Sequence, residues 1–160
     1  MDTKKIDQYM SLAAKEAESN LKTEAGGPFG AVIANEQGVL VTAHNQVLAD
    51  QDPTAHAEIT AIRKATKKLG TYDLSGYTLY TSCYPCPMCL GAIIWSNIKV
   101  AYYGNTAKDA AKIGFRDDYI YNFIKGNGTD KTVLDLKSSN RDHTIKAFNQ
   151  FEDRKTKVIY

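Results

Sequence analysis

The sequence predicts a single domain of the α/β class. Its 160 residues are the usual length of one domain, and the fractions of hydrophobic residues (43%) and charged residues (24%) are typical of soluble globular proteins. Between residues 77 and 105 an apolar strand, a buried helix and another strand follow one another, as in two parallel strands joined by a helical crossover. No repeat or low-complexity segment divides the chain, so we expect residues 1–160 to form one domain.

The first part of the chain is predicted to be an amphipathic helix followed by a β-hairpin. Apolar residues recur at steps of three and four between residues 4 and 24, which is the period of a helix with one buried face, and "GGP" ends it. "FGAVIAN" and "VLVTAHN" have the composition of strands and flank the turn "EQG". The expected buried stripe of the helix consists of Ile6, Met10, Ala13, Ala17 and Leu21.

A second helix and the crossover unit make up the middle of the chain. Residues 56–69 have a broad apolar face and are followed by Gly70, so we expect a helix packed on the sheet. "YTLYTS" is predicted to be the third strand, residues 86–96 the next buried helix, and "KVAYYG" the fourth strand.

The remaining segments are more polar. Residues 106–125 are expected to be helical in one or two pieces, "TVLDL" to form a fifth strand, and "TIKAFNQFEDRKTK" to form a closing helix. "KGNGTDK", residues 125–131, is the best candidate for a hinge or a long turn, because two glycines and an asparagine lie among polar residues.

The charge of the chain argues against a nucleic-acid-binding protein, and the distribution of its apolar residues argues against a membrane protein. The net charge is +2 and the sequence pI is about 8.3, whereas a nucleic-acid-binding domain would have a pI above ~9. The N-terminus has no apolar signal segment, and the longest near-apolar run, "CLGAIIW", is far shorter than the ~20 residues of a membrane span. We therefore expect a cytoplasmic protein that binds neither nucleic acid nor a membrane.

All three cysteines of the chain lie within "CYPCPMC", residues 83–89. An odd number in so short a stretch argues against a disulfide framework and favours a metal or redox site. Pro85 favours an extended residue before it and a helix after it, so Cys83 ends the strand while Cys86 and Cys89 lie on one face of the first helical turn. There the helix dipole favours the thiolate that binds metal.

The number of ligands narrows the kind of metal site. An iron–sulfur cluster needs four cysteines, and a closed structural zinc site takes four protein ligands. Three protein ligands plus a water are the open arrangement of catalytic zinc. His56, in "DPTAHAEI" at the start of the other buried helix, is the candidate third ligand, so we expect one zinc ion (Zn2+) per chain, bound by His56, Cys86 and Cys89.

Glu58 completes an arrangement, H-x-E…P-C-x-x-C, that is typical of zinc-dependent deaminases. Zinc lowers the pKa of a bound water from about 15.7 to about 7, and Glu58 would take the proton of that water. Positions i and i+2 of a helix point about 200° apart, so we expect Glu58 to act on water and substrate instead of binding the same metal as His56.

These motifs resemble those of the cytidine-deaminase-like superfamily, and within it most closely those of bacterial guanine deaminases. The resemblance covers nearly the whole chain, in "GGPFGAVI", "DPTAHAEITAIRKA", "YTSCYPCPMCLGAI" and a "GF" that shortly precedes two aspartates. It implies a three-layer α/β/α fold with a mixed five-stranded sheet. The implied activity is hydrolytic deamination of a purine base, guanine to xanthine plus ammonia.

The resemblance also implies roles for individual residues. Glu58 and Asp117 would carry protons, and Asp117 would also contact the polar edge of the base. The other expected substrate-binding residues are Asn45, Trp95, Phe115 and Tyr160. A homodimer is implied as well, in which the C-terminal segment from about residue 131 is swapped, so that the end of one chain covers the pocket of the other.

Several alternatives remain open at this point. Tyr84 stands where the family usually has Glu, but it flanks the zinc site and is not expected to abolish activity. Arg116 stands where the residue is often acidic, and guanosine deaminases share much of the pattern, so guanosine and melamine-like or pterin substrates stay possible. A tRNA adenosine deaminase shares "DPTAHAE" and the P-C-x-M-C run but predicts a strongly basic tail, whereas residues 125–160 carry eight basic and five acidic residues. A catalytically inactive zinc-binding module is the alternative that is not an enzyme. Glu58 argues against it, because a purely structural site would not need this acid.

Overall fold

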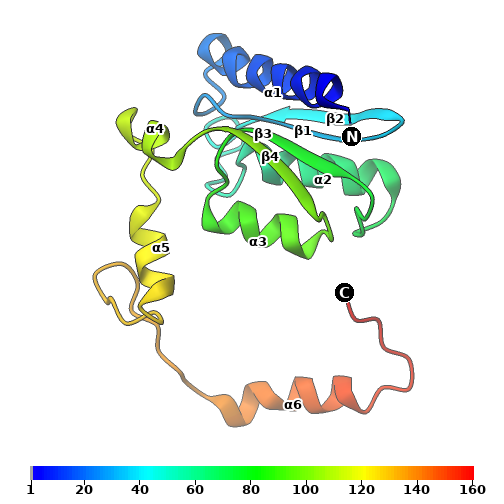
Figure 1. The fold of residues 1–160 in the computed structure, drawn as a ribbon. Coiled ribbons are helices and arrows are strands. Elements are labelled where there is room, and N and C mark those ends of the chain that lie inside the picture. The colour runs from blue at the N-terminus through cyan, green and yellow to red at the C-terminus, as the bar shows by residue number, and fades with distance from the viewer. Residues whose placement is uncertain (1) are drawn as a thin grey trace. The chain divides into compact units, whose positions relative to one another are not determined.

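A computed structural model describes residues 2–160 of the chain. The chain forms two compact units, Met1–Asp117 and Asp118–Tyr160. In the first unit one helix covers one face of a β-sheet and two helices cover the other, which is a three-layer α/β/α arrangement (Figure 1). The second unit is helical where it has regular structure.

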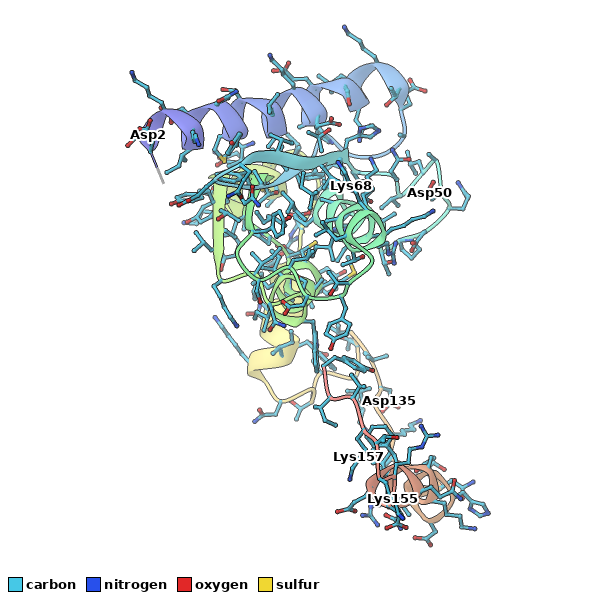
Figure 2. All side chains as sticks on the ribbon, turned by 90° about the vertical axis from the view of Figure 1, so that its right-hand side faces the viewer. Asp2, Asp50, Lys68, Asp135, Lys155 and Lys157 are labelled. Atoms are coloured by element: carbon cyan, nitrogen blue, oxygen red, sulfur yellow. The ribbon has the colours of Figure 1, made fainter. Side chains whose placement is uncertain are left out.

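The helix α1 (Thr3–Thr23) begins as the sequence predicts. Asp2 precedes it in an extended conformation, and its carboxylate accepts a hydrogen bond from the backbone N–H of Lys4 (3.2 Å), which caps the helix. Figure 2 labels Asp2 at this end of α1. Glu24 follows the helix in the left-handed conformation (φ 53°), and its N–H donates to the carbonyl of Asn20.

The buried face of α1 differs from the predicted stripe at its end. Ala13 and Ala17 are buried as expected, but Leu21 is 72% exposed and the neighbouring Asn20 is only 4% exposed. In this last turn the buried position is therefore residue 20, one residue before the position that the spacing of apolar residues predicts. Asn20 is buried because its amide donates hydrogen bonds to loop carbonyls of the same unit.

The sheet contains four strands within residues 2–160. They are β1 (Gly30–Asn35), β2 (Gly38–His44), β3 (Thr78–Cys83) and β4 (Val100–Asn105), in the order β2-β1-β3-β4. β1 pairs antiparallel with both β2 and β3, whereas β3 and β4 are parallel, so the sheet is mixed. The hairpin and the crossover unit are thus confirmed, but the prediction of five strands is wrong.

The segment "TVLDL", residues 132–136, does not form the expected fifth strand. The carboxylate of Asp130 accepts from the backbone N–H and the hydroxyl of Thr132, at 3.0 and 2.6 Å, and its carbonyl accepts from the N–H of Val133. These local bonds hold the beginning of the segment in a turn, because an Asp side chain competes with a strand ladder for backbone groups.

Side chains along the buried strands point alternately to the two faces of the sheet, so the core consists of two clusters, one on each face. Ala31, Ile33 and Leu79 contribute to the cluster that also contains residues of α2 (Ala57–Leu69) and α3 (Pro87–Trp95). Val32 and Tyr80 lie in the cluster with α1. Successive strand residues point to opposite faces, so a strand covered by helices on both faces reads as continuously apolar.

Short helices follow the sheet. α4 (Ala107–Lys112) ends the regular structure of the first unit and α5 (Asp118–Lys125) begins the second, so residues 106–125 are helical in two pieces. Residues 126–128 form a turn, as predicted. The closing helix α6 (Arg141–Glu152) starts before and ends before the predicted one, and Lys155 and Lys157 lie beyond its end (Figure 2).

In the part of the chain that the structure describes, no helix has both the length and the apolar character needed to cross a membrane.

Candidate metal centre

Two helix starts bring three metal-binding side chains together. His56 is the N-cap residue of α2 and Cys86 the N-cap residue of α3, both in extended conformations (ψ 158° and 168°). Pro87 occupies the first position of α3, where its missing N–H costs nothing, and Cys89 lies in the first turn. The donor atoms of His56, Cys86 and Cys89 all lie within 4.8 Å of one another, as the sequence predicted.

The spacing of these donor atoms fits tetrahedral zinc. The Nδ1 atom of His56 is 3.6 Å from the Sγ atom of Cys86 and 3.6 Å from the Sγ atom of Cys89. Zinc bonds of about 2.3 Å to sulfur and about 2.05 Å to nitrogen, at the tetrahedral angle, separate nitrogen and sulfur by about 3.6 Å. His56 therefore presents Nδ1 as its ligand atom, and the three residues form a site suited to zinc with one open position.

Electrostatics in the cluster favour a cation. The hydrogen bond with Cys89, together with that of His56, lowers the pKa of Cys86 to about 4 despite burial. The pKa of Cys89 is raised because Cys86 is its hydrogen-bond partner and because it is buried. The hydrogen bond with Cys86 likewise raises the pKa of His56. Binding of a metal to these ligands would release protons.

Cys83 lies outside this cluster. Its thiol is buried and donates to the backbone carbonyl of Thr106, with a sulfur–oxygen distance of 3.6 Å. Burial raises the pKa of Cys83 to about 11, which disfavours the thiolate that a metal would require. The choice of Cys86 and Cys89 over Cys83, made from the position of Pro85, agrees with this geometry.

Glu58 lies beside the cluster in a buried position. One carboxylate oxygen, Oε1, accepts from the hydroxyl of Thr81 (3.0 Å), and the other, Oε2, accepts from the thiol of Cys89 (3.4 Å). Burial raises the pKa of Glu58, so this carboxylate takes up a proton more readily than an exposed one does. His56 is the cap and not a helical residue, so Glu58 faces the same cluster although it is two positions away.

Asn45 follows the last residue of β2 and is held on several sides. Its N–H donates to the carbonyl of Phe29 (3.0 Å), and its side-chain oxygen accepts from the N–H of Val47 (3.0 Å). A Cβ atom at Gly26 would lie 2.0 Å from that side-chain oxygen, so only glycine fits there. The segment "GGPF" thus packs directly against Asn45, which explains Gly26, the first glycine of the motif.

Of the other predicted substrate-binding residues, Phe115, Asp117 and Trp95 belong to the first unit and Tyr160 belongs to the second. Phe115 meets Phe29 edge to face, with ring centroids 5.0 Å apart, and its ring lies so close to Gly27 that a Cβ atom there would clash. Asp117 ends the first unit, and its charge is among the causes that raise the pKa of His56. Trp95 is the last residue of α3 and is 69% exposed. Tyr160 belongs to the second unit, and its role stays a prediction.

Two residues at the site escaped sequence analysis. Thr81 donates to Glu58 from within β3, and Asn20 donates to the carbonyl of Asn45 from α1. Thr81 could have been singled out from the sequence, because it is a polar residue within a strand that was predicted to be buried. Asn20 gave no such signal, since a polar residue on an amphipathic helix ordinarily faces solvent.

The chain is similar to known proteins over most of its length. Residues 3–105 match the family model described as the cytidine and deoxycytidylate deaminase zinc-binding region. The chain is 40% identical to guanine deaminase of Bacillus subtilis over 151 residues, which are 93% of this chain and 97% of that protein. It is 36% identical to a tRNA-specific adenosine deaminase of Buchnera aphidicola over 127 residues, 78% of this chain and 82% of that protein.

The structure agrees with the sequence comparison. The X-ray structure of guanine deaminase from Bacillus subtilis superimposes with a TM-score of 0.90 and 39% identity, over 100% of this chain and 99% of that chain. The residues that match the family model include the starts of α2 and α3, where His56, Cys86 and Cys89 lie. The chain therefore belongs to the cytidine and deoxycytidylate deaminase family, whose members share this zinc-binding region.

Proposed function

We propose that the protein is a zinc-dependent hydrolase that converts guanine and water to xanthine and ammonia. The observation that carries the proposal is the placement of Glu58, whose buried carboxylate lies 3.4 Å from Cys89 beside the three-ligand cluster. A site that served only to hold the fold together would gain nothing from a buried acid there, because burying an ionisable group is costly. The full-length similarity to a guanine deaminase supports guanine as the substrate.

The side chains around the cluster have distinct tasks in this reaction. Zinc, held by His56, Cys86 and Cys89, would supply a water-derived nucleophile at neutral pH. Glu58 accepts the proton of the attacking water and delivers it to N3 of guanine as the oxygen adds to C2. It then takes the remaining proton of the hydroxyl group on C2 and passes it to the amino group, so that the C2–N bond breaks, the oxygen becomes the carbonyl of xanthine, and ammonia leaves. Its burial keeps bulk water away from this proton path.

Recognition of the base is assigned to a second group of residues. Asn45 lies next to the "GGPF" segment, and Phe115 packs against the same segment, so these two can act on one ligand. Asp117 supplies a carboxylate for the N–H groups of guanine or for proton transfer. Trp95 would add an aromatic wall, and Tyr160 would close the site.

The C-terminal unit suggests how that closure occurs. α5 and α6 contain no buried residue, and the large apolar side chains Phe148, Val158 and Ile159 are at least 68% exposed. Apolar groups of this size are stabilised when they are covered. We place them in a homodimer with swapped C-terminal segments, in which Tyr160 of one protomer reaches the pocket of its partner.

Ammonia release tests the activity. The purified zinc protein is incubated with guanine, with guanosine and with a tRNA anticodon stem-loop containing adenosine, and ammonia and the base products are measured. We expect xanthine from guanine and little product from the other two. Turnover of guanosine or of the anticodon without turnover of guanine would refute the proposed substrate, and no ammonia from any of them would refute the activity.

Mixing two inactive variants tests the swapped dimer. One variant lacks residues 158–160 and the other carries Glu58→Gln. If the end of one chain completes the pocket of the other, a mixed dimer contains one pocket with both an intact Glu58 and an intact C-terminus, so activity returns on mixing. Full activity of the truncated protein, or an active monomer in sedimentation, would contradict this arrangement.

A further inference from the structure

A hydroxyl group from the sheet meets the carboxylate of Glu58. Thr81 lies on β3, and its side chain is 1% exposed. Its hydroxyl donates to Oε1 of Glu58 at 3.0 Å. β3 is paired on both sides, with Thr81 opposite Ala31 of β1 and opposite Tyr103 of β4, so the donor is fixed by two neighbouring strands.

The two oxygens of Glu58 have different surroundings. Oε1 is bound to the sheet through Thr81, whereas Oε2 faces the metal cluster and accepts from the thiol of Cys89. A cysteine that binds zinc is a thiolate and has no proton to donate. The bond from Cys89 is therefore lost in the zinc protein, while the bond from Thr81 does not depend on the metal.

Apart from this hydrogen bond, the hydroxyl of Thr81 is a polar group on a face of the strand that packs against apolar residues. Leu79, two residues earlier on the same face, belongs to the apolar cluster shared with α2 and α3. Valine has nearly the shape of threonine and would fill the same position without burying a polar group. What threonine adds is one hydrogen bond to the carboxylate that carries protons in the proposed mechanism.

We propose that Thr81 is a positioning residue, which keeps the carboxylate of Glu58 in the rotamer that directs Oε2 to the metal-bound side of the site. The inference rests on the proposed function, because it assigns Glu58 its part in proton transfer. A carboxylate freed from Thr81 can rotate away from the reacting atoms, and misplacement of a catalytic group by about 1 Å can cost on the order of 100-fold in rate.

Kinetics of Thr81→Val and Thr81→Ser test the proposal. We expect Thr81→Val to keep one zinc per chain and to keep the KM for guanine within about twofold, while kcat falls by roughly 10- to 100-fold. Thr81→Ser retains the hydroxyl and should recover most of kcat. Thr78→Val removes another buried hydroxyl from the same strand, away from Glu58, and should leave kcat nearly unchanged.

Crystal structures of the zinc-loaded variants give a second readout that needs no substrate. The carboxylate of Glu58 should occupy one rotamer in the wild type and in Thr81→Ser, and should be rotated or split between rotamers in Thr81→Val. The inference is overturned if Glu58 superimposes in all three proteins, or if Thr81→Val has wild-type kcat. It is also overturned if Thr78→Val lowers kcat as much as Thr81→Val does. A wild type without activity on guanine would instead refute the proposed substrate, while the rotamer comparison still decides the role of Thr81.

Discussion

The side-chain amide of Asn20 donates a hydrogen bond of 2.8 Å to the backbone carbonyl of Asn45, which lies 25 residues away. The same amide also donates to the carbonyl of Gly27 (2.8 Å), and its oxygen accepts from the hydroxyl of Thr23 (2.9 Å). One buried side chain of α1 therefore connects the helix to the "GGPF" loop and to the end of β2. These are the two segments that carry the predicted base-binding part of the site.

Replacing Asn20 by Leu should destabilise the protein. Leucine has a similar volume but leaves the carbonyls of Gly27 and Asn45 without the amide donor, and each buried group that loses its partner costs about 1–3 kcal/mol. We expect the free energy of unfolding, measured by urea denaturation monitored by circular dichroism, to fall by at least ~1 kcal/mol. Ser19→Ala, on the same helix, is the control and should change it little. Equal stability of Asn20→Leu and the wild type would show that these bonds contribute nothing net.

Zinc content should separate the three cysteines. Cys86→Ser and Cys89→Ser each remove a ligand, so we expect them to lose most of the zinc, whereas Cys83→Ser keeps about one zinc per chain. Metal analysis of the purified proteins measures this, and a chelator should lower the melting temperature of the wild type and of Cys83→Ser. Loss of zinc in all three variants, or an iron chromophore, would show that the ligand set is wrong.

Glu58→Gln should separate metal binding from turnover. The amide has almost the same shape and still accepts a hydrogen bond from Thr81, but it cannot take a proton. We expect full zinc content and an unchanged melting temperature with a loss of about 10²- to 10⁴-fold in kcat. Ammonia release under saturating guanine measures the loss. Turnover close to that of the wild type would remove Glu58 from the mechanism.

Glu16 should contribute stability that depends on pH. Burial alone would raise its pKa, but hydrogen bonds from Thr42 and His44 outweigh burial, and the pKa of Glu16 lies below its ordinary value of 4.5. A lowered pKa means that the folded protein favours the ionised form, so the contribution is present above pH 4.5 and is lost as the pH falls through the lowered value.

The free energy of unfolding of Glu16→Gln, compared with that of the wild type, tests this dependence. We expect the variant to be less stable at pH 7 and the difference to shrink below pH 4.5. Glu18→Gln, an exposed neighbour on α1, is the control and should follow the wild type at every pH. A difference that stays constant between pH 7 and pH 3.5 would mean that the charge of Glu16 is not responsible.

The metal site could be predicted from the sequence because its information is local. Proline forces a strand end and a helix start around "CYPCPMC", and the dipole at that helix start favours thiolates, so the roles of Cys86 and Cys89 follow from neighbouring residues. His56 was identified as the third ligand because, with Glu58 two residues later, it completes the spacing H-x-E…P-C-x-x-C that is typical of zinc-dependent deaminases. The strands β1 and β3 could also be predicted, since β1 is mostly apolar and β3 is rich in β-branched and aromatic residues.

What the sequence did not predict depends on contacts between distant segments. Thr81 meets Glu58 across 23 residues, and Asn20 meets Asn45 across 25, so neither contact has a local pattern. Leu21 was expected inside because an apolar side chain fits the helical period, but burial of Asn20 placed the face one residue earlier. "TVLDL" has strand composition, yet the side chain of Asp130 satisfies its first backbone groups locally. A strand requires a partner as well as a composition.

The strand order β2-β1-β3-β4 also gives the two parts of the proposed site different local stabilities. Amide protons of β1 and β3 can exchange with solvent only when a neighbouring strand opens on one side or the other, whereas β2 and β4 lie at the edges of the described sheet and can fray first. Thr81 lies on a central strand, while Asn45 follows an edge strand. Hydrogen exchange should therefore be slow along β3 around Thr81 and faster along β2, which precedes Asn45. The residue that we propose to position Glu58 thus belongs to the most persistent part of the sheet, whereas the strand that leads to Asn45 opens first.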